Sequence, residues 1–436
     1  MARAKKEAAL TPEERLQVAL VPDWEWPYKL PGNWCWTYFK SISTIQTGRK
    51  DANYGSDEGK YPFFTCAAEP IRCHGYSFDC RAILLAGNGD INNISRYNGK
   101  FEAYQRTYVV KIAEPLCFDY IFYWFKYRWF DFNKGKMFGT AIPYIRLGNL
   151  QEFPTPIPPL AEQQRIVDRI ESLFAKLDEA KEKAQAVVDS FETRKAAILH
   201  KAFTGELTAK WREERGVGMD SWEKKSVGEL CISLKYGTAK KSDASGNVVV
   251  LRMGNLQQGE IDWSGLAYSN DPDDIERYKL FPGDVLFNRT NSAALVGKTA
   301  IYRGEHPAIY AGYLIKLDYD HDKIIGDYLN YALNTLDAKK YCNSVKTDGV
   351  NQSNINAKKI GAYSFNVPNI PEQEKIVSVI QKLLSKEQQS KAAAEAVLDQ
   401  IDLMKKSILA RTFRGELGTN DPSEESAVGL LKRTIL

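Results

Sequence analysis

The residues in this chain whose types could carry chemistry form few groups, and the first is a cluster of possible metal ligands. Cys66, Cys73, His74 and Cys80 lie close together in the sequence. Thiolate and imidazole groups suit zinc, but structural zinc sites pair their ligands about two to four residues apart. The gaps between these cysteines are six residues long. This spacing does not favour a metal site, and we predict none.

A second group, Gly297-Lys298-Thr299, matches the end of a phosphate-binding loop. That loop needs an earlier glycine, and Ser292 stands in its place, which excludes the motif. The four histidines lie in unrelated settings, so no pair of general base and nucleophile stands out. The chain also lacks the Asn-Pro-Pro-aromatic motif of amino-group methyltransferases and any glycine fingerprint for a nucleotide cofactor. We therefore predict no catalytic residue and no cofactor bound to this chain.

The remaining polar residues that could act on a ligand lie in loops that contain glycine. Arginine, asparagine, glutamine and lysine are the side chains that read base edges in the major groove of DNA. Asparagine, glycine and serine are also the ordinary residues of turns, so each loop has a purely structural alternative. The candidate DNA-contacting residues in the first half are Gln46, Thr47, Arg49, Lys50, Asn88, Lys100 and Arg106. Those in the second half are Lys240, Lys241, Asn288, Arg289, Thr290, Asn291, Asn351 and Gln352.

The elements that must position these loops occur twice. Residues 162–167, EQQRIV, return as residues 372–377, EQEKIV, and residues 202–207, AFTGEL, return as residues 412–417, TFRGEL. Both matches have the same offset of 210 residues, and so long a period indicates one structural unit built twice. The residues between the copies differ. The pattern therefore predicts a repeated frame that presents two different globular inserts.

Each copy of the frame contains a long helix. Residues 161–203 include no glycine or proline, and their apolar positions follow a heptad, which predicts a helix of roughly 60 Å. A helix of this length cannot bury its apolar stripe against a small domain, so we expect it to pair with another helix. Long heptad helices most often dimerise between chains. Two such helices in one chain, with similar ends, favour an intramolecular pair instead.

An antiparallel register in which paired residue numbers sum to 581 places the seam positions of one helix on those of the other. Large residues then face small ones, as Phe191 faces Ser390, and the charged seam residues Arg194 and Glu387 meet. Sums of 574 and 588 also keep seam on seam but separate the two charges. The predicted seam consists of Leu173, Leu177, Val187, Phe191, Arg194 and Ile198 in the first helix, and Leu383, Glu387, Val397, Ile401, Met404 and Ile408 in the second.

Short β-branched and aromatic runs broken by Gly, Asn and Asp predict strands in both inserts, and helices are expected at residues 118–130 and 325–336. The predicted fold class is α+β: two globular domains separated by a long antiparallel two-helix coiled coil, in a pseudo-two-fold internal repeat. The expected segments are an N-terminal extension at 1–29, a first globular domain at 30–157, a first long helix at 158–207, a second domain at 208–367, a second long helix at 368–417 and a C-terminal tail at 418–436.

The two ends of the chain differ in their predicted order. Thr11 and Pro12 mark the start of a helix in the N-terminal extension, since one residue can cap the helix and the other suits its first turn. This extension is expected to pack on the second half of the chain or on a partner. The C-terminal tail is polar and is predicted to be loosely ordered.

The overall composition sets the broad class of protein. The net charge of +4 is too small to prove nucleic-acid binding by itself. No apolar run reaches the ~18 residues that a membrane span needs, and residues 1–9 are basic but lack the apolar core of a signal peptide. Seven cysteines at irregular spacing fit a reducing compartment. We therefore expect a cytoplasmic protein without a membrane partner.

Several of these motifs together resemble the specificity subunits of type I restriction-modification systems. They are PPLAEQQRIV at 158–167, AFTGEL at 202–207, the second copies of both, and LPGNW at 30–34. Residues 284–298, DVLFNRTNSAALVGK, look like a recurring stretch of that family's target recognition domains, and residues 61–65 and 99–101 look like another subfamily of the same domain. The second copy departs from the pattern at residues 369–371, where the Pro-Pro-Leu run is not kept.

This resemblance implies a function and a set of partners. Each insert is expected to be a target recognition domain that reads one half of a split sequence in double-stranded DNA, with the helices as a ruler between the halves. The implied partners are two modification subunits, which bind S-adenosylmethionine and methylate adenine N6, and motor-nuclease subunits, which use ATP and Mg²⁺. The chain itself would be non-catalytic and would direct N6-adenine methylation and ATP-dependent restriction. The alternatives are a coiled-coil scaffold whose inserts bind protein, and a methyltransferase with unusual motifs.

Overall fold

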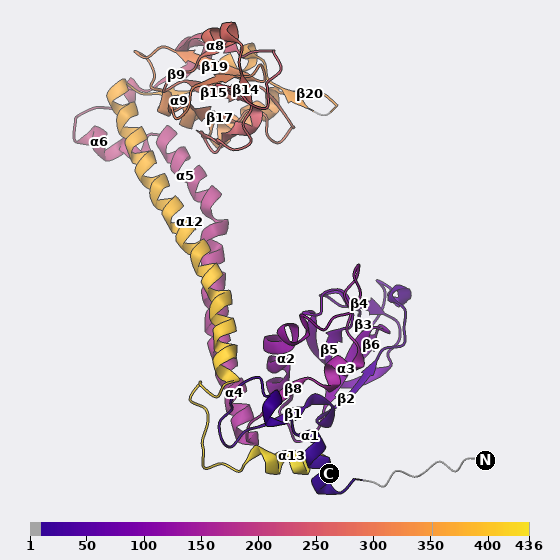
Figure 1. Cartoon of the computed structure of the whole chain (residues 1–436). Helices are drawn as coiled ribbons and strands as arrows, with labels where there is room; N and C mark the ends of the chain where they lie inside the picture. Colours follow the sequence, from indigo (N-terminus) through magenta and orange to yellow (C-terminus); the bar gives the residue numbers. More distant parts are fainter. Residues whose placement is uncertain (1–9, 351, 436) are drawn as a thin grey trace. The chain divides into compact units, whose positions relative to one another are not determined.

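The computed structural model describes residues 10–350 and 352–435. Asn351, one of the predicted DNA contacts, lies outside the described residues, as does the basic run at residues 1–9. The chain divides into two compact units, unit 1 being Met1–Lys183 with Ala396–Leu436 and unit 2 being Ala184–Glu395. Each unit contains one insert and a part of both long helices (Figure 1). Helices and sheets occur in both units, so the fold is α+β.

The helices are spread over both units, and no helix within residues 10–350 and 352–435 has the length and apolarity to cross a membrane. They are α1 (Pro12–Ala19), α2 (Phe118–Asn133), α3 (Leu147–Gln151), α4 (Leu160–Asp189), α5 (Phe191–Phe203), α6 (Ala209–Glu213), α7 (Val227–Leu230), α8 (Pro272–Tyr278), α9 (Gly326–Leu333), α10 (Leu336–Val345), α11 (Ala357–Gly361), α12 (Ile370–Thr412) and α13 (Ala427–Ile435).

The insert of unit 1 is built on a six-stranded sheet. Its order is β2 (Ser43–Thr47), β7 (Thr107–Ile112), β5 (Phe78–Ala86), β6 (Ile94–Ala103), β3 (Tyr61–Phe64) and β4 (Ile71–Cys73). Neighbours are antiparallel except for the parallel pair β3–β6. A separate pair, β1 (Cys35–Tyr38) and β8 (Pro154–Ile157), closes the two ends of the insert. The predicted helix at 118–130 is α2, and its Trp124, Phe125 and Trp129 are fully buried, because the segment is almost wholly apolar.

Gly48 follows the end of β2 and lies against the backbone of residue 103. A Cβ atom at this position would lie 1.8 Å from the carbonyl oxygen of Ala103, so any side chain must push the two segments apart. We expect Gly48→Ala to destabilise unit 1 by about 1–3 kcal/mol, as overpacking does elsewhere. Urea unfolding followed by tryptophan fluorescence measures this loss. Gly148→Ala in α3 is the matched control, since no atom lies within 4 Å of its added Cβ; equal stability of the two variants would contradict the argument.

The insert of unit 2 contains several small sheets. The largest has the order β10 (Cys231–Tyr236), β19 (Leu314–Tyr319), β15 (Val285–Asn288) and β17 (Thr299–Ile301). One three-stranded sheet has the order β14 (Tyr268–Ser269), β11 (Val248–Leu251) and β18 (Ala308–Tyr310). Another has the order β16 (Thr290–Asn291), β21 (Ser353–Asn354) and β20 (Thr347–Asp348). The two-stranded pairs are β12 (Leu256–Gln257) with β13 (Glu260–Ile261), and β9 (Glu223–Ser226) with β22 (Ser364–Val367).

The predicted helix at 325–336 is interrupted in the structure. It is two helices, because α9 ends at Leu333 and α10 begins at Leu336. Thr335 lies between them in an extended conformation, and its hydroxyl accepts a hydrogen bond from the backbone N–H of Ala338 at 3.2 Å. A threonine that caps the second helix in this way cannot continue the first one.

The predicted helix at 161–203 also has a break, which lies at Ser190 between α4 and α5. The Ser190 hydroxyl donates to the carbonyl of Ala186, and Arg194 Nη2 donates to the carbonyl of Val187 at 3.1 Å. The Ala186 carbonyl also keeps its backbone hydrogen bond from Ser190 N at 3.1 Å, so it accepts two hydrogen bonds at the break. Such side-chain hydrogen bonds to helix carbonyls often bend a helix. The second long helix, α12, is unbroken.

Within each unit, charged residues connect the two long helices. In unit 2, Arg194 Nε donates to Glu387 Oε2 at 2.5 Å, the contact on which the predicted register depends. In unit 1, Lys405 lies 2.5 Å from Asp178 and Lys181 lies 3.7 Å from Asp402. Residue numbers fall on one helix as they rise on the other, so the segments in unit 1 run antiparallel.

Some predicted seam positions are wrong. Ser390 is exposed, and Lys391 lies over the Phe191 ring in its stead, with Nζ 5.0 Å from the ring centroid. Val397 and Met404 are 40% and 48% exposed, while the next residues, Leu398 and Lys405, are half-buried. A helix with 3.6 residues per turn drifts by about 20° per heptad against a strict 3.5-residue repeat. Because of this drift, the residues of α12 that face inward lie one position later in the sequence than the predicted seam residues.

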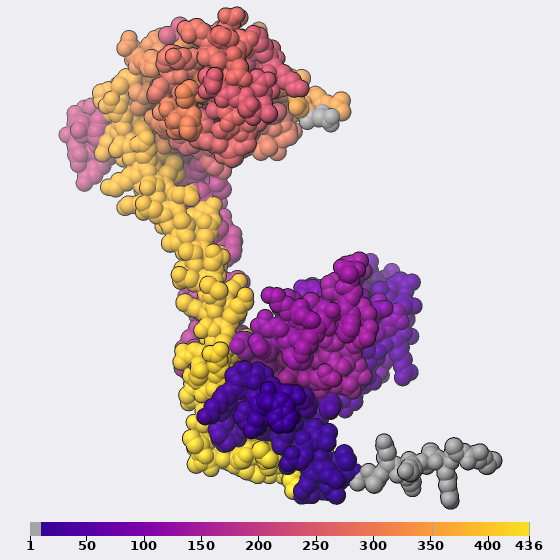
Figure 2. Space-filling model, in the orientation of Figure 1, coloured from indigo at the N-terminus to yellow at the C-terminus, as the bar shows by residue number. Residues whose placement is uncertain are grey.

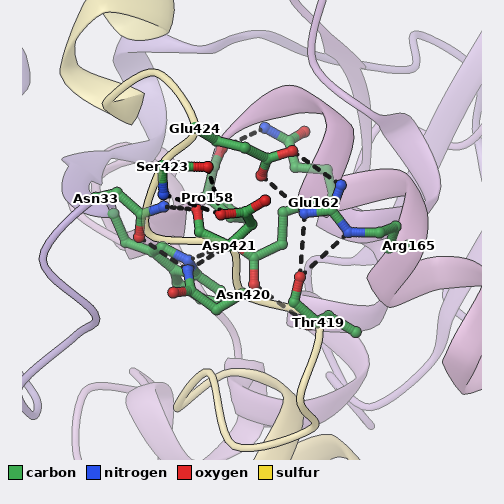
Figure 3. Close-up of polar contacts among 11 residues, drawn as sticks. Asn33, Pro158, Glu162, Arg165, Thr419, Asn420, Asp421, Ser423 and Glu424 are labelled. Carbon is green, nitrogen blue, oxygen red and sulfur yellow. Dashed lines mark hydrogen bonds and ion pairs between the residues drawn. The ribbon is translucent and has the colours of Figure 1, made fainter.

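The start of each long helix carries a buried glutamate that ties it to its insert. Glu162 and Glu372 are both fully buried. Glu162 accepts a hydrogen bond from Trp34 Nε1 at 2.8 Å. It also accepts one from Asn420 Nδ2 at 2.9 Å (Figure 3). Burial raises the pKa of the Glu162 carboxyl, although these hydrogen bonds oppose the rise. Glu372 accepts from Trp222 Nε1 at 3.1 Å and from Arg212 Nη1 at 2.6 Å. The repeat therefore places a tryptophan on the equivalent glutamate in both units.

The C-terminal tail is ordered, so the prediction of a loose segment was wrong. Arg165 Nη2 lies 2.7 Å from Glu424 Oε2 and donates to the carbonyl of Thr419 at 3.1 Å (Figure 3). Beyond this turn, α13 buries Leu430 and Leu431 in the core of unit 1. The buried leucines supply the free energy that a purely polar tail would lack.

The predicted helix in the N-terminal extension is α1, and it packs on α13. Thr11 caps α1 in a reciprocal capping box with Glu14, as the sequence indicated. Lys432 of α13 lies 2.8 Å from Glu13 of α1. The yellow C-terminal helix lies against the indigo N-terminal segment on the surface (Figure 2). The two ends of the chain therefore stabilise each other within unit 1.

Candidate nucleic-acid interface

The structure brings together the three predicted loops of the first insert. Gly48 N donates to the carbonyl of Thr107 at 3.2 Å, and Gly87 N donates to the carbonyl of Arg106 at 2.9 Å. Thr47, Gly87 and Arg106 line one surface hollow of about 280 Å³. Loops that are far apart in the sequence thus form a single polar surface at one end of the sheet.

Most of the predicted contacts of this insert are accessible. Gln46, Thr47, Arg49 and Arg106 are exposed, and their polar groups are available to a ligand. Lys50 is half-buried and its Nζ lies 4.5 Å from the centroid of the Tyr54 ring. Asn88 is also half-buried, and its backbone forms a bridge with Tyr144.

Lys100 lies apart from this hollow, in a patch of aromatic and basic residues that the sequence reasoning missed. Its Nζ is 4.8 Å from the centroid of Tyr76, and a hydrogen bond with Tyr76 raises the pKa of Lys100. Tyr76 packs on Tyr61 with ring centroids 4.9 Å apart, and Lys60 lies over Tyr61 at 5.6 Å. Tyr76 is exposed and Tyr61 is half-buried. Lysines beside accessible tyrosine rings are typical of surfaces that hold phosphate and stack on bases. The adjacent pair Lys60-Tyr61 was the signal available in the sequence.

Arg289 connects the predicted loops of the second insert. Its Nη1 donates to the carbonyl of Gly312 and its Nη2 donates to Asn354 Oδ1, both at 3.3 Å. Its guanidinium lies 4.7 Å from the centroid of the Tyr236 ring. The side chain is half-buried, so its main role in this conformation is to hold neighbouring segments in place.

The small sheet β16–β21–β20 carries the next group of candidates. Asn291 pairs with Ser353, and Ser353 pairs in turn with Asp348. The β20 end of this sheet projects from the insert (Figure 1), and Gln352 at its turn is exposed. Asn291 is half-buried at the edge of the same sheet. A narrow projecting hairpin, whose turn carries the exposed Val350 and Gln352, suits insertion into a DNA groove.

Two predicted contacts of this insert do not face solvent. Asn288 has no exposed surface, and its amide donates to the carbonyl of Met253 at 3.4 Å. Thr290 is 8% exposed, and its hydroxyl accepts from Asn354 Nδ2 at 2.7 Å. Their polar atoms are used inside the protein, so we remove both residues from the contact set.

Lys240 and Lys241 of the second insert differ in whether an acidic residue already pairs with them. Lys240 is exposed but lies 2.6 Å from Asp271, and this hydrogen bond raises the pKa of Lys240. Lys241 is exposed and forms none of the ion pairs found among residues 10–350 and 352–435. Lys241 is therefore the stronger candidate for a phosphate contact.

A protein-family model for the type I restriction modification DNA specificity domain matches this chain twice, over residues 31–188 and 219–396. The two matches cover more than half of the chain and fall on the two repeats. The chain belongs to this family.

Curated relatives are similar over long stretches. The specificity subunit of the type I restriction enzyme EcoDI from Escherichia coli is 27% identical over 414 residues, which are 89% of this chain and 90% of that protein. The EcoKI specificity subunit of Escherichia coli strain K12 is 27% identical over 288 residues, which are 64% of this chain and 61% of that protein.

Solved structures of this family have a similar fold. One, from work on complex assembly and conformational transition of the type I R-M system, has a TM-score of 0.66 at 20% identity, covering 90% of this chain and 100% of that chain. The HsdS subunit of Thermoanaerobacter tengcongensis has a TM-score of 0.58 at 20% identity, over the same shares of the two chains. At this identity the likeness concerns the fold alone.

One of the cysteines considered as a possible metal ligand is part of the core. Cys73 is fully buried, with its thiol donating to the carbonyl of Gly75 at 3.1 Å, and burial raises the pKa of that thiol. Across residues 10–350 and 352–435, no group of three or more His, Cys, Asp or Glu side chains is arranged to hold a metal ion. The candidate functional sites are the polar loop surfaces of the two inserts, which carry exposed residues such as Arg49 and Gln352.

Proposed function

We propose that this chain is the DNA specificity subunit of a type I restriction-modification system, which reads a bipartite target in double-stranded DNA. The observation that carries the proposal is the double match to the specificity-domain family, one match on each repeat. The two inserts present dissimilar loop surfaces on an equivalent frame. Dissimilar surfaces on a repeated frame suit the reading of two different half-sites.

In the first insert, we assign DNA contact to the exposed cations Arg49 and Arg106, with Gln46 and Thr47 beside them. The patch of Lys60 and Lys100 on tyrosine rings adds contacts to the phosphate backbone. In the second insert, we assign contact to Lys241, Asn291 and Gln352. Arg289 positions these loops through Gly312 and Asn354.

The long helices act as a spacer in this proposal. They form an antiparallel two-helix coiled coil whose length sets the distance between the two half-sites. The Arg194–Glu387 ion pair in unit 2 and the Asp178–Lys405 pair in unit 1 support this arrangement. Pairs of opposite charge at facing positions favour one register over its neighbours.

The chain does not supply the chemistry of the system. Two modification subunits bring S-adenosylmethionine and methylate adenine N6, and motor-nuclease subunits bring ATP and Mg²⁺. The target adenine must leave the base stack to be methylated, so the specificity subunit contributes by holding the flanking DNA. This division agrees with the absence of a catalytic motif in the sequence.

The test of this function is to alter one loop surface at a time. In cells that contain the modification subunits, N6-methyladenine is mapped for Arg49→Ala/Arg106→Ala and for Asn291→Ala/Gln352→Ala. Each pair is expected to relax recognition in one half of the target only, because each lost base contact is worth ~1–3 kcal/mol of discrimination. The two variants serve as controls for each other. Equal loss of both halves in either variant would show that the inserts do not read DNA independently.

A further inference from the structure

A short hairpin of unit 1, residues 138–144, corresponds to the projecting β20–β21 hairpin of unit 2. Phe138 N donates to the carbonyl of Tyr144 at 2.9 Å, and Tyr144 N donates to that of Phe138 at 2.9 Å. The residues 210 positions later are 348–354, which include the end of β20 and the whole of β21. The offset of the repeated frame therefore extends back from the long helices into these hairpins.

The turns of the two hairpins are built on equivalent glycines. A Cβ atom added at Gly139 would lie 2.7 Å from the carbonyl oxygen of Ile142, and one added at Gly349 would lie 3.0 Å from that of Gln352. Each glycine thus lies against the carbonyl three residues later, so the two turns close in the same way. The residues that the turns present differ, because Ile142 in unit 1 is 61% exposed where unit 2 exposes Gln352.

The two hairpins are also anchored at equivalent places. Ile145 N donates to the carbonyl of Gly87 at 2.9 Å, and Ile355 N donates to the carbonyl of Arg289 at 2.8 Å. Ile145 also lines the polar hollow of unit 1 that contains Arg106. The unit 1 hairpin therefore starts at the edge of the surface to which DNA contact is assigned, although none of the predicted contacts lies on it.

An exposed arginine follows this hairpin and stacks on it. The guanidinium of Arg146 lies 3.9 Å from the centroid of the Phe138 ring, and the Phe138 and Tyr144 rings stack with centroids 5.6 Å apart. Arg146 Nη2 donates to Tyr144 Oη at 3.4 Å, and no carboxylate of residues 10–350 and 352–435 pairs with Arg146. Arginine carries several N–H donors in a planar fork. The aromatic stack orients this fork, and most of its donors have no partner among the described residues.

Unit 2 holds an arginine at the matching residue in a different way. Asn354 is the equivalent of Tyr144, and its Oδ1 accepts from Arg289 Nη2 at 3.3 Å. Arg289 is half-buried, whereas Arg146 is exposed. The residue of unit 1 at the place of Arg289 is Gly87, where an added Cβ would lie 2.2 Å from a backbone carbonyl oxygen. An arginine does not fit at that place in unit 1, and the hairpin carries one instead.

The composition of the unit 1 hairpin favours contact with bases over contact with phosphates. Residues 137–145, MFGTAIPYI, contain no charged residue, and Ile142 is an exposed apolar side chain in the turn. Phosphate contacts are made mainly by several cations and polar groups together. A single oriented arginine beside an apolar turn is suited to the major groove, where arginine pairs with guanine and apolar groups contact the thymine methyl.

We propose that Arg146 reads a guanine in the half-site bound by unit 1, through the O6 and N7 atoms of its major-groove edge, with Phe138 and Tyr144 as positioning residues. The inference rests on the proposed function. In unit 2 the place of Arg146 is taken by Asn356, whose side chain accepts a backbone N–H of α11 at 2.9 Å. The equivalent hairpins of the two units therefore read their half-sites with different residues.

The first test maps N6-methyladenine in cells that contain the full chain and the modification subunits. Arg146→Ala should relax the preference for guanine at one position by roughly 10- to 100-fold. That position should lie in the half-site that Arg49→Ala/Arg106→Ala also alters. Phe138→Leu should relax the same position less, since the arginine stays but loses its aromatic support. The matched control is Arg15→Ala, which removes an exposed arginine of α1 in the same unit and should leave the target unchanged.

The second test changes the DNA and separates base reading from phosphate contact. In duplexes that carry 7-deazaguanine at the identified position, the N7 acceptor is missing while the phosphates are intact. The affinity of the wild-type chain, assembled with the modification subunits, should fall roughly 3- to 10-fold on this replacement. The affinity of the assembled Arg146→Ala variant should not change, because the contact is already lost.

The outcomes that overturn the inference differ from those that overturn the proposed function. If Arg146→Ala lowers methylation at all targets alike, or if both assembled complexes respond equally to 7-deazaguanine, Arg146 does not read a base and the inference fails. Equal relaxation by Arg15→Ala contradicts it as well. A wild-type chain that directs no methylation to a bipartite target would overturn the proposed function itself.

Discussion

Removing one heptad from each long helix is expected to abolish methylation at the original target and to create methylation at a target with a shorter gap. The residues to delete are 175–181 in α4 and 400–406 in α12, which face each other in the register that sums to 581. Seven helical residues span about 10 Å, and base pairs in DNA lie ~3.4 Å apart. The gap between the half-sites should therefore shorten by up to about three base pairs, while both half-sites keep their sequence.

Deleting whole heptads keeps the remaining seam residues in phase, and this makes the experiment specific. Deletion from one helix alone is the control, since it removes one partner of the Asp178–Lys405 pair and shortens one helix by about 10 Å relative to the other; it should abolish methylation altogether. Mapping N6-methyladenine in cells that carry the modification subunits reads out both results. If the double deletion still directs methylation to the original gap, the helices do not set the spacing.

The second large effect is expected at the buried ion pair that joins α12 to unit 2. Arg212 Nη1 lies 2.6 Å from Glu372 Oε1, and the side chain of Glu372 has no exposed surface. Arg212→Ala would leave a buried carboxylate with Trp222 and Thr208 as its only remaining donors among the described residues. Breaking a buried pair from one side costs about 3–5 kcal/mol, so unit 2 should unfold at a clearly lower urea concentration.

Unit 1 provides the internal control for this prediction. Its equivalent glutamate, Glu162, has hydrogen bonds from Trp34 and Asn420, and no arginine of the described residues pairs with it. Arg212→Ala should therefore leave the unfolding midpoint of unit 1 unchanged. Hydrogen exchange followed by mass spectrometry separates the two units. The double variant Arg212→Met/Glu372→Leu should recover most of the lost stability, since apolar residues often replace a buried pair at little cost. An Arg212→Ala variant as stable as the wild type would show that the Arg212–Glu372 pair does not stabilise unit 2.

The buried glutamates at the starts of α4 and α12 show how a repeated sequence can hold the same helix start by different hydrogen bonds. The glutamate, the tryptophan and the terminal phenylalanine recur in both units, and each glutamate receives its tryptophan N–H. The other hydrogen-bond donor to the glutamate differs between the units. In unit 2 it is Arg212, in the segment just after the first long helix, and in unit 1 it is Asn420, in the C-terminal tail. The C-terminal tail thus gives Glu162 a hydrogen bond, as the segment after α5 does for Glu372.

Patterns that depend on backbone periodicity were readable from the sequence. The offset of 210 residues predicted the equivalence of Glu162 with Glu372 and of Phe203 with Phe413, and both pairs occupy matching places. The heptad predicted the long helices and the meeting of Arg194 with Glu387. The apolar run at 118–130 predicted a buried helix. These features are local or strictly repeated, so the identities of nearby residues are enough to specify them.

Only the tertiary structure decided which polar loop residues face solvent and which ends of the chain meet. Asn288 and Gln352 are alike in type and setting, yet one is buried against Met253 and the other is exposed on a turn. Burial depends on segments tens of residues away, which composition does not report. For the same reason the polar tail was predicted to be loosely ordered. In the structure, Leu430 and Leu431 belong to a core that includes residues near the other end of the chain. The sequence by itself determined the repeated frame, and long-range packing decided which faces of that frame remain open to partners.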